Sequence, residues 1–282
     1  MSTHSERSEH TLTVPGATLF YRLQGAGPPL LVVPAGDGDA DATSGLVAHL
    51  TDRHTVITYD RRGLSRSVLD DPDAEYDLTD HTDDLHRLLS TVTSEAAHIL
   101  GFSFGGFIGL DLLAKHPDQI RTLIAHEAPV VQVLPAAERE QLQRILSDVA
   151  TLFEQQGPAL AMARFQDFAG MRFDEWEPDA PRPEPSQRDE NNTPIFLGSH
   201  APQSHRHLLD LDAIAAERAK VVPGCSTTSP DGMGHQCAIA LARALDLPAV
   251  DFPGSHAGFL THPRATAARV HEILAQRGTL VS

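Results

Sequence analysis

The chain has 282 residues, 41% of them hydrophobic, and can therefore bury the core of one large domain that carries an insertion. Its 38 acidic residues against 22 basic ones give a net charge of −16, which argues against nucleic acid or an anionic membrane surface as a partner. The sequence has neither the run of about 18 apolar residues that spans a membrane nor the apolar stretch of a secretion signal, so we expect a cytoplasmic protein with no membrane partner.

The first half of the chain alternates between predicted strands and helices. Residues 1–10 are expected to form a disordered tail, and the alternating pattern of residues 11–23 predicts a hairpin around Pro15-Gly16. Apolar runs predict buried strands, and helical spacing of apolar residues predicts the helices between them. The strands are expected at 30–33, 55–59, 97–100 and 122–125, and the helices at 41–50, 79–92 and 107–115. This succession predicts an α/β fold with a mostly parallel sheet covered by helices on both faces.

The alternation stops between residues 135 and 208. Helical patterns at 136–153 and 159–168 are followed by residues 178–185, whose four prolines exclude a continuous helix. We interpret 135–208 as a helical cap, or lid, inserted into a core domain made of residues 1–134 and 209–282. The core is completed by predicted strands at 220–222 and 250–252 and predicted helices at 235–245 and 263–276.

A serine between two glycines marks the candidate reactive group. Gly101-Phe102-Ser103-Phe104-Gly105 lies between a predicted strand and a predicted helix. When a strand turns sharply into a helix, the residues two before and two after the turn must be small, because the two elements nearly collide there. The pattern therefore predicts a nucleophile elbow with Ser103 at its tip.

A serine hydroxyl is a weak nucleophile at neutral pH, so it needs a histidine to take its proton and an acid to orient that histidine. His256 follows the last predicted strand and precedes the last predicted helix, which is the best placement among the sixteen histidines. The alternative for His256 is a surface loop position.

Two residues compete for the role of the acid. The loop after the penultimate strand, Gly224 to Ser229, holds small neutral residues where an acid is expected, and Asp231 follows later beside Gly232, where a turn or helix cap is the usual use of an aspartate. Glu127 comes directly after the strand at 122–125. Because a strand end places a side chain at the reactive edge of the sheet, we favour Glu127 and keep Asp231 as the alternative acid.

An oxyanion formed during attack needs two backbone N–H donors, one from the residue after the nucleophile and one from the loop after the third strand. Phe104 supplies the first donor. The glycine-rich loop Val33 to Gly38 supplies the second, with Gly36 preferred and Ala35 as the alternative donor and substrate contact.

No metal ion or other cofactor is expected. The aspartates of the oxyanion loop lack the glycine and glutamate of a calcium loop, three histidines of the cap lack a helical ligand pair, and the two cysteines lack metal spacing and are expected to be structural thiols. These residues are Asp37, Asp39 and Asp41, His200, His205 and His207, and Cys225 and Cys237. The charged segment Asp60 to Ser67 is interpreted as a solvated turn that braces the loops around the elbow.

Three motifs in this order resemble the α/β-hydrolase superfamily over almost all of the chain: 60–65, 101–106 and 254–259. Within it, the chain is similar to the lidded lactonases that open the macrocyclic lactone zearalenone. The shared features are Pro34 in the oxyanion loop, His126-Glu127 with a proline two residues on, and the acid-free loop at 224–229. That resemblance implies Glu127 as the triad acid. Trp176, the single tryptophan, is expected either over the ligand as a lid residue or in core packing.

The expected function is hydrolysis of a small carboxylic ester or lactone through an acyl-enzyme on Ser103, without a cofactor. A serine at the elbow excludes the relatives that use an aspartate nucleophile on alkyl halides and epoxides. The alternatives are a small-molecule receptor, or catalytically idle binding protein, on the same fold, and a carbon–carbon bond hydrolase or cofactor-free peroxidase with the same triad. The sequence leaves open whether the chain forms a homodimer.

Overall fold

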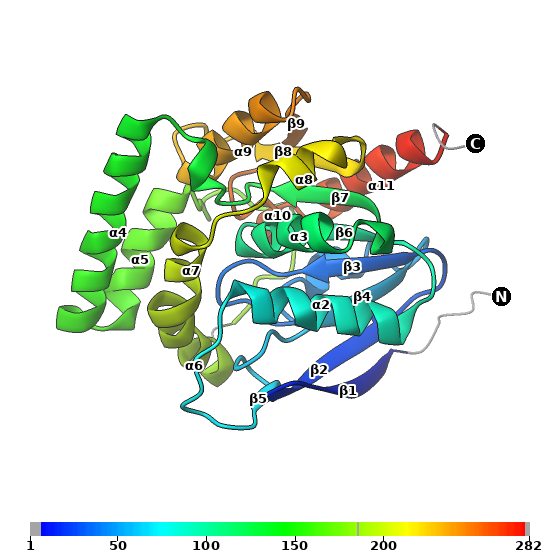
Figure 1. Ribbon diagram of the computed structural model, residues 1–282, viewed down its shortest axis with the longest axis horizontal. Coiled ribbons are helices and arrows are strands. Elements are labelled where there is room, and N and C mark those ends of the chain that lie inside the picture. The colour runs from blue at the N-terminus through cyan, green and yellow to red at the C-terminus, as the bar shows by residue number, and fades with distance from the viewer. Residues whose placement is uncertain (1–6, 185, 280–282) are drawn as a thin grey trace.

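In a computed structural model, which describes residues 7–184 and 186–279, a twisted sheet of nine strands forms the centre of the molecule (Figure 1). Its order is β1-β2-β4-β3-β6-β7-β8-β9, with the short β5 paired to β2. The strands are β1 Ser8–Val14, β2 Ala17–Gln24, β3 Pro29–Val33, β4 Thr55–Tyr59, β5 Val68–Leu69, β6 Ala97–Phe102, β7 Ile120–His126, β8 Val221–Ser226 and β9 Val250–Phe252. From β4 to β9 every neighbouring pair in that order is parallel, as the apolar runs predict.

The predicted hairpin is confirmed, since β1 and β2 pair antiparallel across Gly16, whose φ of 78° suits the turn. The expected disordered tail is wrong at its end, because residues 8–10 already pair with β2. The alternation of polar and apolar residues that predicted a strand from residue 11 is weaker at residues 8–10, and pairing with β2 extends the strand over them. Residues 1–6 of the expected tail lie outside the described residues.

Helices cover both faces of the sheet (Figure 1). One face buries apolar side chains of α2, α3, α8 and α9, and the other buries those of α1, α10 and α11. The helices are α1 Ser44–Val47, α2 Leu78–Val92, α3 Phe104–Lys115, α8 Leu211–Ala216, α9 Met233–Ala244, α10 Gly258–Thr261 and α11 Pro263–Thr279. The helix predicted at 41–50 is shortened to α1, because Asp39 holds the amides of Asp41 and Ala42 in a turn just before it.

The inserted residues fold into their own helical layer at one end of the sheet (Figure 1). It consists of α4 Ala136–Gln156, α5 Pro158–Ala169, α6 Gln187–Ile195, a π-helical turn Phe196–His200 and α7 Ala201–Arg206, packed around a separate apolar cluster. The two predicted helices are confirmed as α4 and α5. The polar sequence of α6, with Pro194 inside it, gave no helical signal. Residues 178–184 of the proline-rich stretch form no helix.

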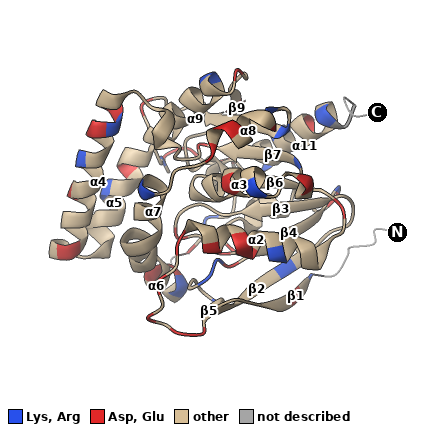
Figure 2. Ribbon diagram, viewed as in Figure 1, with Lys and Arg blue, Asp and Glu red and all other residues tan. Residues whose placement is uncertain are grey.

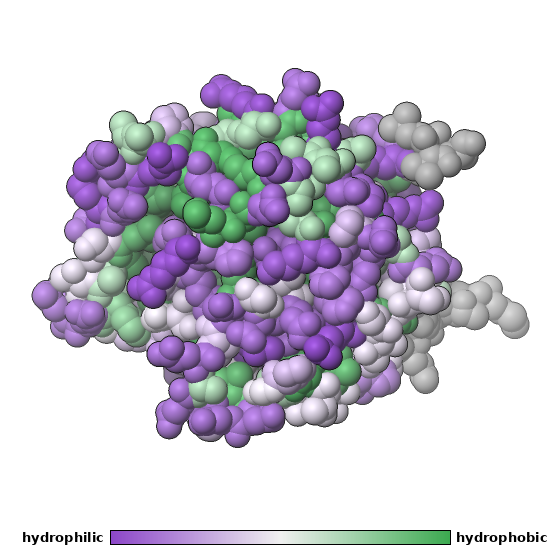
Figure 3. Space-filling model, viewed as in Figure 1, coloured by the Kyte–Doolittle hydropathy of each residue, from purple (hydrophilic) through white to green (hydrophobic). Residues whose placement is uncertain are grey.

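The surface is mixed in charge, with an acidic run along the loop between β5 and α2 (Figure 2). Apolar side chains gather over the junction of the cap helices and α8 (Figure 3), where Leu208 is 72% exposed. Cys225 and Cys237 are buried free thiols, as expected. Within residues 7–184 and 186–279, none of the helices has the length and apolar character to cross a bilayer.

Candidate active site

Ser103 stands at the sharp junction between β6 and α3. Its φ of 50° and ψ of −118° are strained for a residue with a side chain, and its amide donates to the carbonyl of His126 at 2.8 Å. A Cβ on Gly101 would lie 2.7 Å from the carbonyl oxygen of Gly105, and a Cβ on Gly105 would collide with the carbonyl of Val33. The backbone therefore has the nucleophile-elbow geometry that the two glycines predict.

Glu127 and His256, 129 residues apart in sequence, are in direct contact. Glu127 has a φ of 48°, which turns the chain at the end of β7 and directs the carboxylate across β8. The ring of His256 donates through Nδ1 to Glu127 Oε2 at 2.5 Å, and both side chains are buried. Burial by itself raises the pKa of Glu127, but the hydrogen bond and charge of His256 outweigh it and lower that pKa to about 2. Glu127 is therefore ionised and paired with the imidazole at neutral pH.

The acid-free loop after β8 supplies the partners of this pair. The amide of Ser226 donates to Glu127 Oε1 at 2.7 Å, and the hydroxyl of Ser229 accepts from the amide of His256 at 3.1 Å. The loop that lacks an acid thus binds the acid that comes from the neighbouring strand. Ser226 and Ser229 have no motif that sequence reasoning could have used.

Gly234 lies against the same pair and was also missed. A Cβ at this position would come within 2.6 Å of His256 Nδ1 and 2.9 Å of Glu127 Oε2. The second residue of α9 must therefore be a glycine for the pair to keep its geometry. The one signal in the sequence was a glycine directly before a predicted helix, and it did not distinguish this role from a turn.

Asp231 lies in an exposed turn before α9, where its carbonyl accepts from the side chain of Gln236. Trp176 is half-buried in the loop after α5, where its indole donates to the carbonyl of Phe173 at 2.8 Å and its ring lies under Arg182. In the part of the chain that the structure describes, neither residue makes a hydrogen bond or ring contact with Ser103, Glu127 or His256. The predicted ligand contact of Trp176 stays a prediction.

The loop after β3 carries the two candidate oxyanion donors. Gly36 has a φ of 34°, and the ring of Phe196 from the cap lies 3.5 Å from the place where its Cβ would be. The carbonyl of Ala35 accepts from the amide of Gly38 at 2.9 Å. Phe104, the other candidate, is the first residue of α3, where backbone N–H groups have no helical partner.

The segment that follows β4 differs from its prediction. Its charges were expected to be solvated, but Asp60 and Arg61 are fully buried and Arg62 is 3% exposed. Arg62 binds Asp84 through two hydrogen bonds of 2.6 and 2.7 Å, and Asp60 accepts from the amide of Ala40 at 2.9 Å. These contacts replace the lost hydration of the charges, which a sequence pattern does not reveal. The predicted bracing of the neighbouring loops is present.

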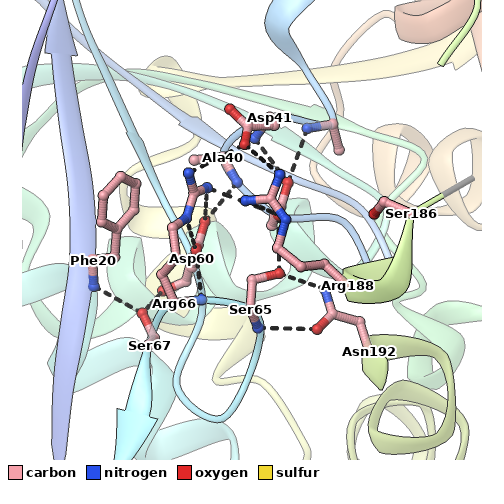
Figure 4. A network of polar contacts seen from close by, with 12 residues as sticks. Phe20, Ala40, Asp41, Asp60, Ser65, Arg66, Ser67, Ser186, Arg188 and Asn192 are labelled. Atoms are coloured by element: carbon pink, nitrogen blue, oxygen red, sulfur yellow. Dashed lines mark hydrogen bonds and ion pairs between the residues drawn. The ribbon is translucent and has the colours of Figure 1, made fainter. Parts of the chain in front are cut away.

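Helix α6 of the cap is bound to this braced region by a polar network (Figure 4). Asn192, 1% exposed, accepts from the amide of Ser65 at 3.0 Å and donates to Ser65 Oγ at 2.9 Å and to the carbonyl of Asp37 at 3.0 Å. Arg188 donates to Asp41 at 2.8 Å, and Thr193 donates to Asp37 at 2.6 Å. The cap is thus fastened to the loop that carries Gly36.

The candidate site is closed to solvent. Ser103 is 8% exposed and His256 is 3% exposed. In the described ranges, no hydrogen bond joins the hydroxyl of Ser103 to His256. Catalytic hydrogen bonds are often long before substrate binds and tighten afterwards. A groove of about 890 Å³ between residues 63–78 and the cap has no lining residue from the candidate triad.

The described residues contain no group of histidine, cysteine and carboxylate side chains that could hold a metal ion. Of the aspartates considered for calcium, Asp39 and Asp41 pair with Arg188, and Asp37 accepts from the hydroxyl of Thr193. His200 stacks on Phe104, with ring centroids 5.7 Å apart, and its Nε2 is 3.0 Å from the hydroxyl of Tyr76.

Comparison with known proteins agrees with this fold. The family model described as the alpha/beta hydrolase fold matches residues 28–200. The protein named "Uncharacterized hydrolase YraK" of Bacillus subtilis (strain 168) is 33% identical over 268 residues, which cover 94% of this chain and 95% of that protein.

Two solved structures share the fold. A structure from work on carboxylesterases of Nitrososphaera gargenis has a TM-score of 0.70 at 17% identity and covers 96% of this chain and 99% of that one. An alpha/beta hydrolase from Sphaerobacter thermophilus DSM 20745 has a TM-score of 0.66 at 20% identity and covers 94% of this chain and 100% of that one.

Proposed function

The chain belongs to the α/β hydrolase family, and on that premise we propose that it is a serine hydrolase that cleaves a carboxylic ester or lactone. The observation that carries the proposal is the buried Glu127–His256 pair at 2.5 Å, together with a serine on a strained elbow whose amide donates to the carbonyl of His126, the residue before Glu127. A carboxylate that holds Nδ1 of an imidazole leaves the other ring nitrogen free to take a proton from a hydroxyl.

The reaction begins when His256 takes the proton of Ser103 while the serine oxygen attacks the substrate carbonyl. The amides of Phe104 and Gly36 donate to the oxyanion, and the ionised Glu127 stabilises the imidazolium. His256 then gives the proton to the leaving alcohol, or to the alkoxide end of an opened lactone. Water, activated by the same histidine, releases the acid and restores Ser103.

The finer proposal is a lactone of the zearalenone type. It is supported by the acid-bearing strand end at Glu127, by the acid-free loop that donates the Ser226 amide, and by Pro34 in the oxyanion loop. A cavity of about 250 Å³ within the cap is lined mainly by apolar side chains of α4, α5, the turn after α6 and α7, and none of its lining residues belongs to the candidate triad. Such a lining suits the apolar part of a substrate that reaches beyond the triad.

The second candidate is a small-molecule binding protein on the same fold. It is favoured by the closed site, in which Ser103 makes no hydrogen bond to His256 among the described residues. The two candidates differ in the reactivity of Ser103, because an idle site does not activate the hydroxyl.

The test is labelling by a fluorophosphonate together with turnover of chromogenic acyl esters and of zearalenone. Wild-type protein is expected to label and to turn over a substrate, and Ser103→Ala is expected to lose the label and about 10³-fold or more in kcat. Ser90→Ala, which removes an exposed hydroxyl from α2, is the matched control and should behave like wild type. Turnover that survives Ser103→Ala rejects the serine mechanism. A wild-type protein that neither labels nor turns over a substrate favours the binding protein.

A further inference from the structure

Arg61 is a buried cation without a carboxylate partner. It lies two residues after the end of β4, is 0% exposed, and forms no ion pair within 4.0 Å in the described part of the chain. Its Nε also has no partner there. An uncompensated buried charge is costly, so its presence calls for a physical reason.

The two ends of its guanidinium bind the oxyanion loop. Nη1 donates to the carbonyl of Pro34 at 2.7 Å, and Nη2 donates to the carbonyl of Gly36. The first carbonyl belongs to the peptide group between residues 34 and 35, and the second to the one between residues 36 and 37. Arg61 therefore holds the two peptide groups on either side of the one that carries the Gly36 N–H.

The peptide group between these two is oriented as a result. Its carbonyl, that of Ala35, accepts from the amide of Gly38 at 2.9 Å. Because a trans peptide is planar and its N–H points opposite its C=O, fixing three successive carbonyls also fixes the directions of the following N–H groups. The same clamp would orient the N–H of Ala35, the alternative donor. A loop with glycines at 36 and 38 has no such rigidity of its own.

The charge of Arg61 also lies close to the side chain of Phe104. The guanidinium carbon is 5.6 Å from the ring centroid of Phe104, whose amide is the other candidate donor. Burial lowers the pKa of Arg61, yet a guanidinium stays protonated in proteins. In a site shielded from water, such a charge acts strongly on negative charge that develops nearby.

We propose that Arg61 is the positioning residue of the oxyanion hole: it orients the Gly36 amide by clamping both neighbouring peptides and adds a buried positive charge beneath the hole. This inference rests on the proposed serine hydrolase function. Under this inference, replacing Arg61 lowers kcat, whereas replacing a purely structural residue lowers only the stability of the fold.

The experiment compares Arg61→Met and Arg61→Lys with Arg62→Met, a control that removes the neighbouring buried arginine and its pair with Asp84. The measurements are kcat and KM for a chromogenic ester, inhibition by an alkylboronic acid whose tetrahedral adduct places an oxygen in the hole, and thermal unfolding. Arg61→Met is expected to lower kcat by about 100-fold, with KM within about 3-fold, and to weaken boronate binding by a similar factor. Arg62→Met is expected to unfold earlier but to keep kcat within about 3-fold.

Arg61→Lys tests the clamp if the methionine variant does not fold. Lysine keeps the charge but lacks the planar fork that spans two carbonyls, so its kcat is expected nearer to that of Arg61→Met than to wild type. A kcat and boronate affinity within about 3-fold of wild type in either folded Arg61 variant overturns the inference.

A crystal structure of an Arg61 variant gives a readout that needs no activity. The peptide between residues 36 and 37 is expected to rotate once its carbonyl loses the guanidinium, and an unmoved loop overturns the inference. Failure of the proposed function is seen separately, as wild-type turnover that does not depend on Ser103.

Discussion

Glu127→Gln tests the triad most directly, because the structure shows what both oxygens of the carboxylate do. Oε2 accepts from His256 Nδ1 at 2.5 Å, and Oε1 accepts from the Ser226 amide at 2.7 Å. Glutamine has one acceptor oxygen and one NH₂ donor in place of the two oxygens. The backbone N–H of Ser226 can only donate, so it will take the amide oxygen.

The NH₂ group of the new side chain then faces Nδ1 of His256. Nδ1 must become an acceptor, which moves the ring proton to Nε2, the nitrogen that has to receive the proton of Ser103. The opposite orientation of the amide places NH₂ against the Ser226 N–H and leaves a buried donor unpaired, at about 1–3 kcal/mol. The first orientation disables the base. The second keeps the proton on Nδ1 but is disfavoured by the unpaired donor and lacks the charge that stabilises the imidazolium, so we expect kcat to fall by about 10³- to 10⁴-fold with KM little changed.

The assay is steady-state hydrolysis of a chromogenic acyl ester, with the rate of fluorophosphonate labelling as a second readout. Asp231→Asn is the matched control, since it makes the same change at an exposed turn, and it should stay within about 2-fold of wild type. A Glu127→Gln enzyme that keeps a tenth of the wild-type kcat would refute the reasoning. So would a large loss confined to Asp231→Asn.

Three further outcomes follow from the same contacts. Gly234→Ala places a methyl carbon 2.6 Å from His256 Nδ1 and should lower kcat by about 100-fold or more at an unchanged KM. Gly198→Ala is the control and should keep the wild-type kcat, because its Cβ meets nothing closer than 3.7 Å. Measuring kcat of both variants checks this prediction. Asn192→Ala leaves buried hydrogen-bond partners of the α6 network unpaired. The free energy of unfolding, measured with urea, should fall by about 1–3 kcal/mol. Because the pKa of Glu127 is lowered from 4.5 to about 2 in the folded state, its ionised form stabilises the protein fully above pH 4.5, and this contribution is lost as the pH falls toward 2. The gap in unfolding temperature between wild type and Glu127→Gln should therefore be smaller at pH 3 than at pH 7, and a constant gap contradicts it.

The sequence determined the features that depend on neighbours along the chain. Apolar runs located the strands β3, β4, β6 and β7 to within one or two residues, because a strand buried on both faces needs continuous apolar side chains. The glycines around Ser103 predicted the elbow, since the close approach of strand and helix excludes larger side chains within that short stretch. The order of motifs also predicted the α/β fold.

What the sequence left open were contacts between residues far apart in it. Glu127 and Asp231 both satisfied the expected order, and only the packing of β7 beside β8 shows Glu127, not Asp231, bonded to His256. Arg61 was read as part of a solvated turn, because the carbonyls that replace its water belong to a loop about 25 residues upstream. Helix α6 gave no periodic signal, because polar contacts to the core hold it in place. Local steric constraints depend on residues adjacent in the sequence, so the sequence reveals them. The partners that neutralise a buried charge or orient a ring are brought together only by the folded sheet and cap.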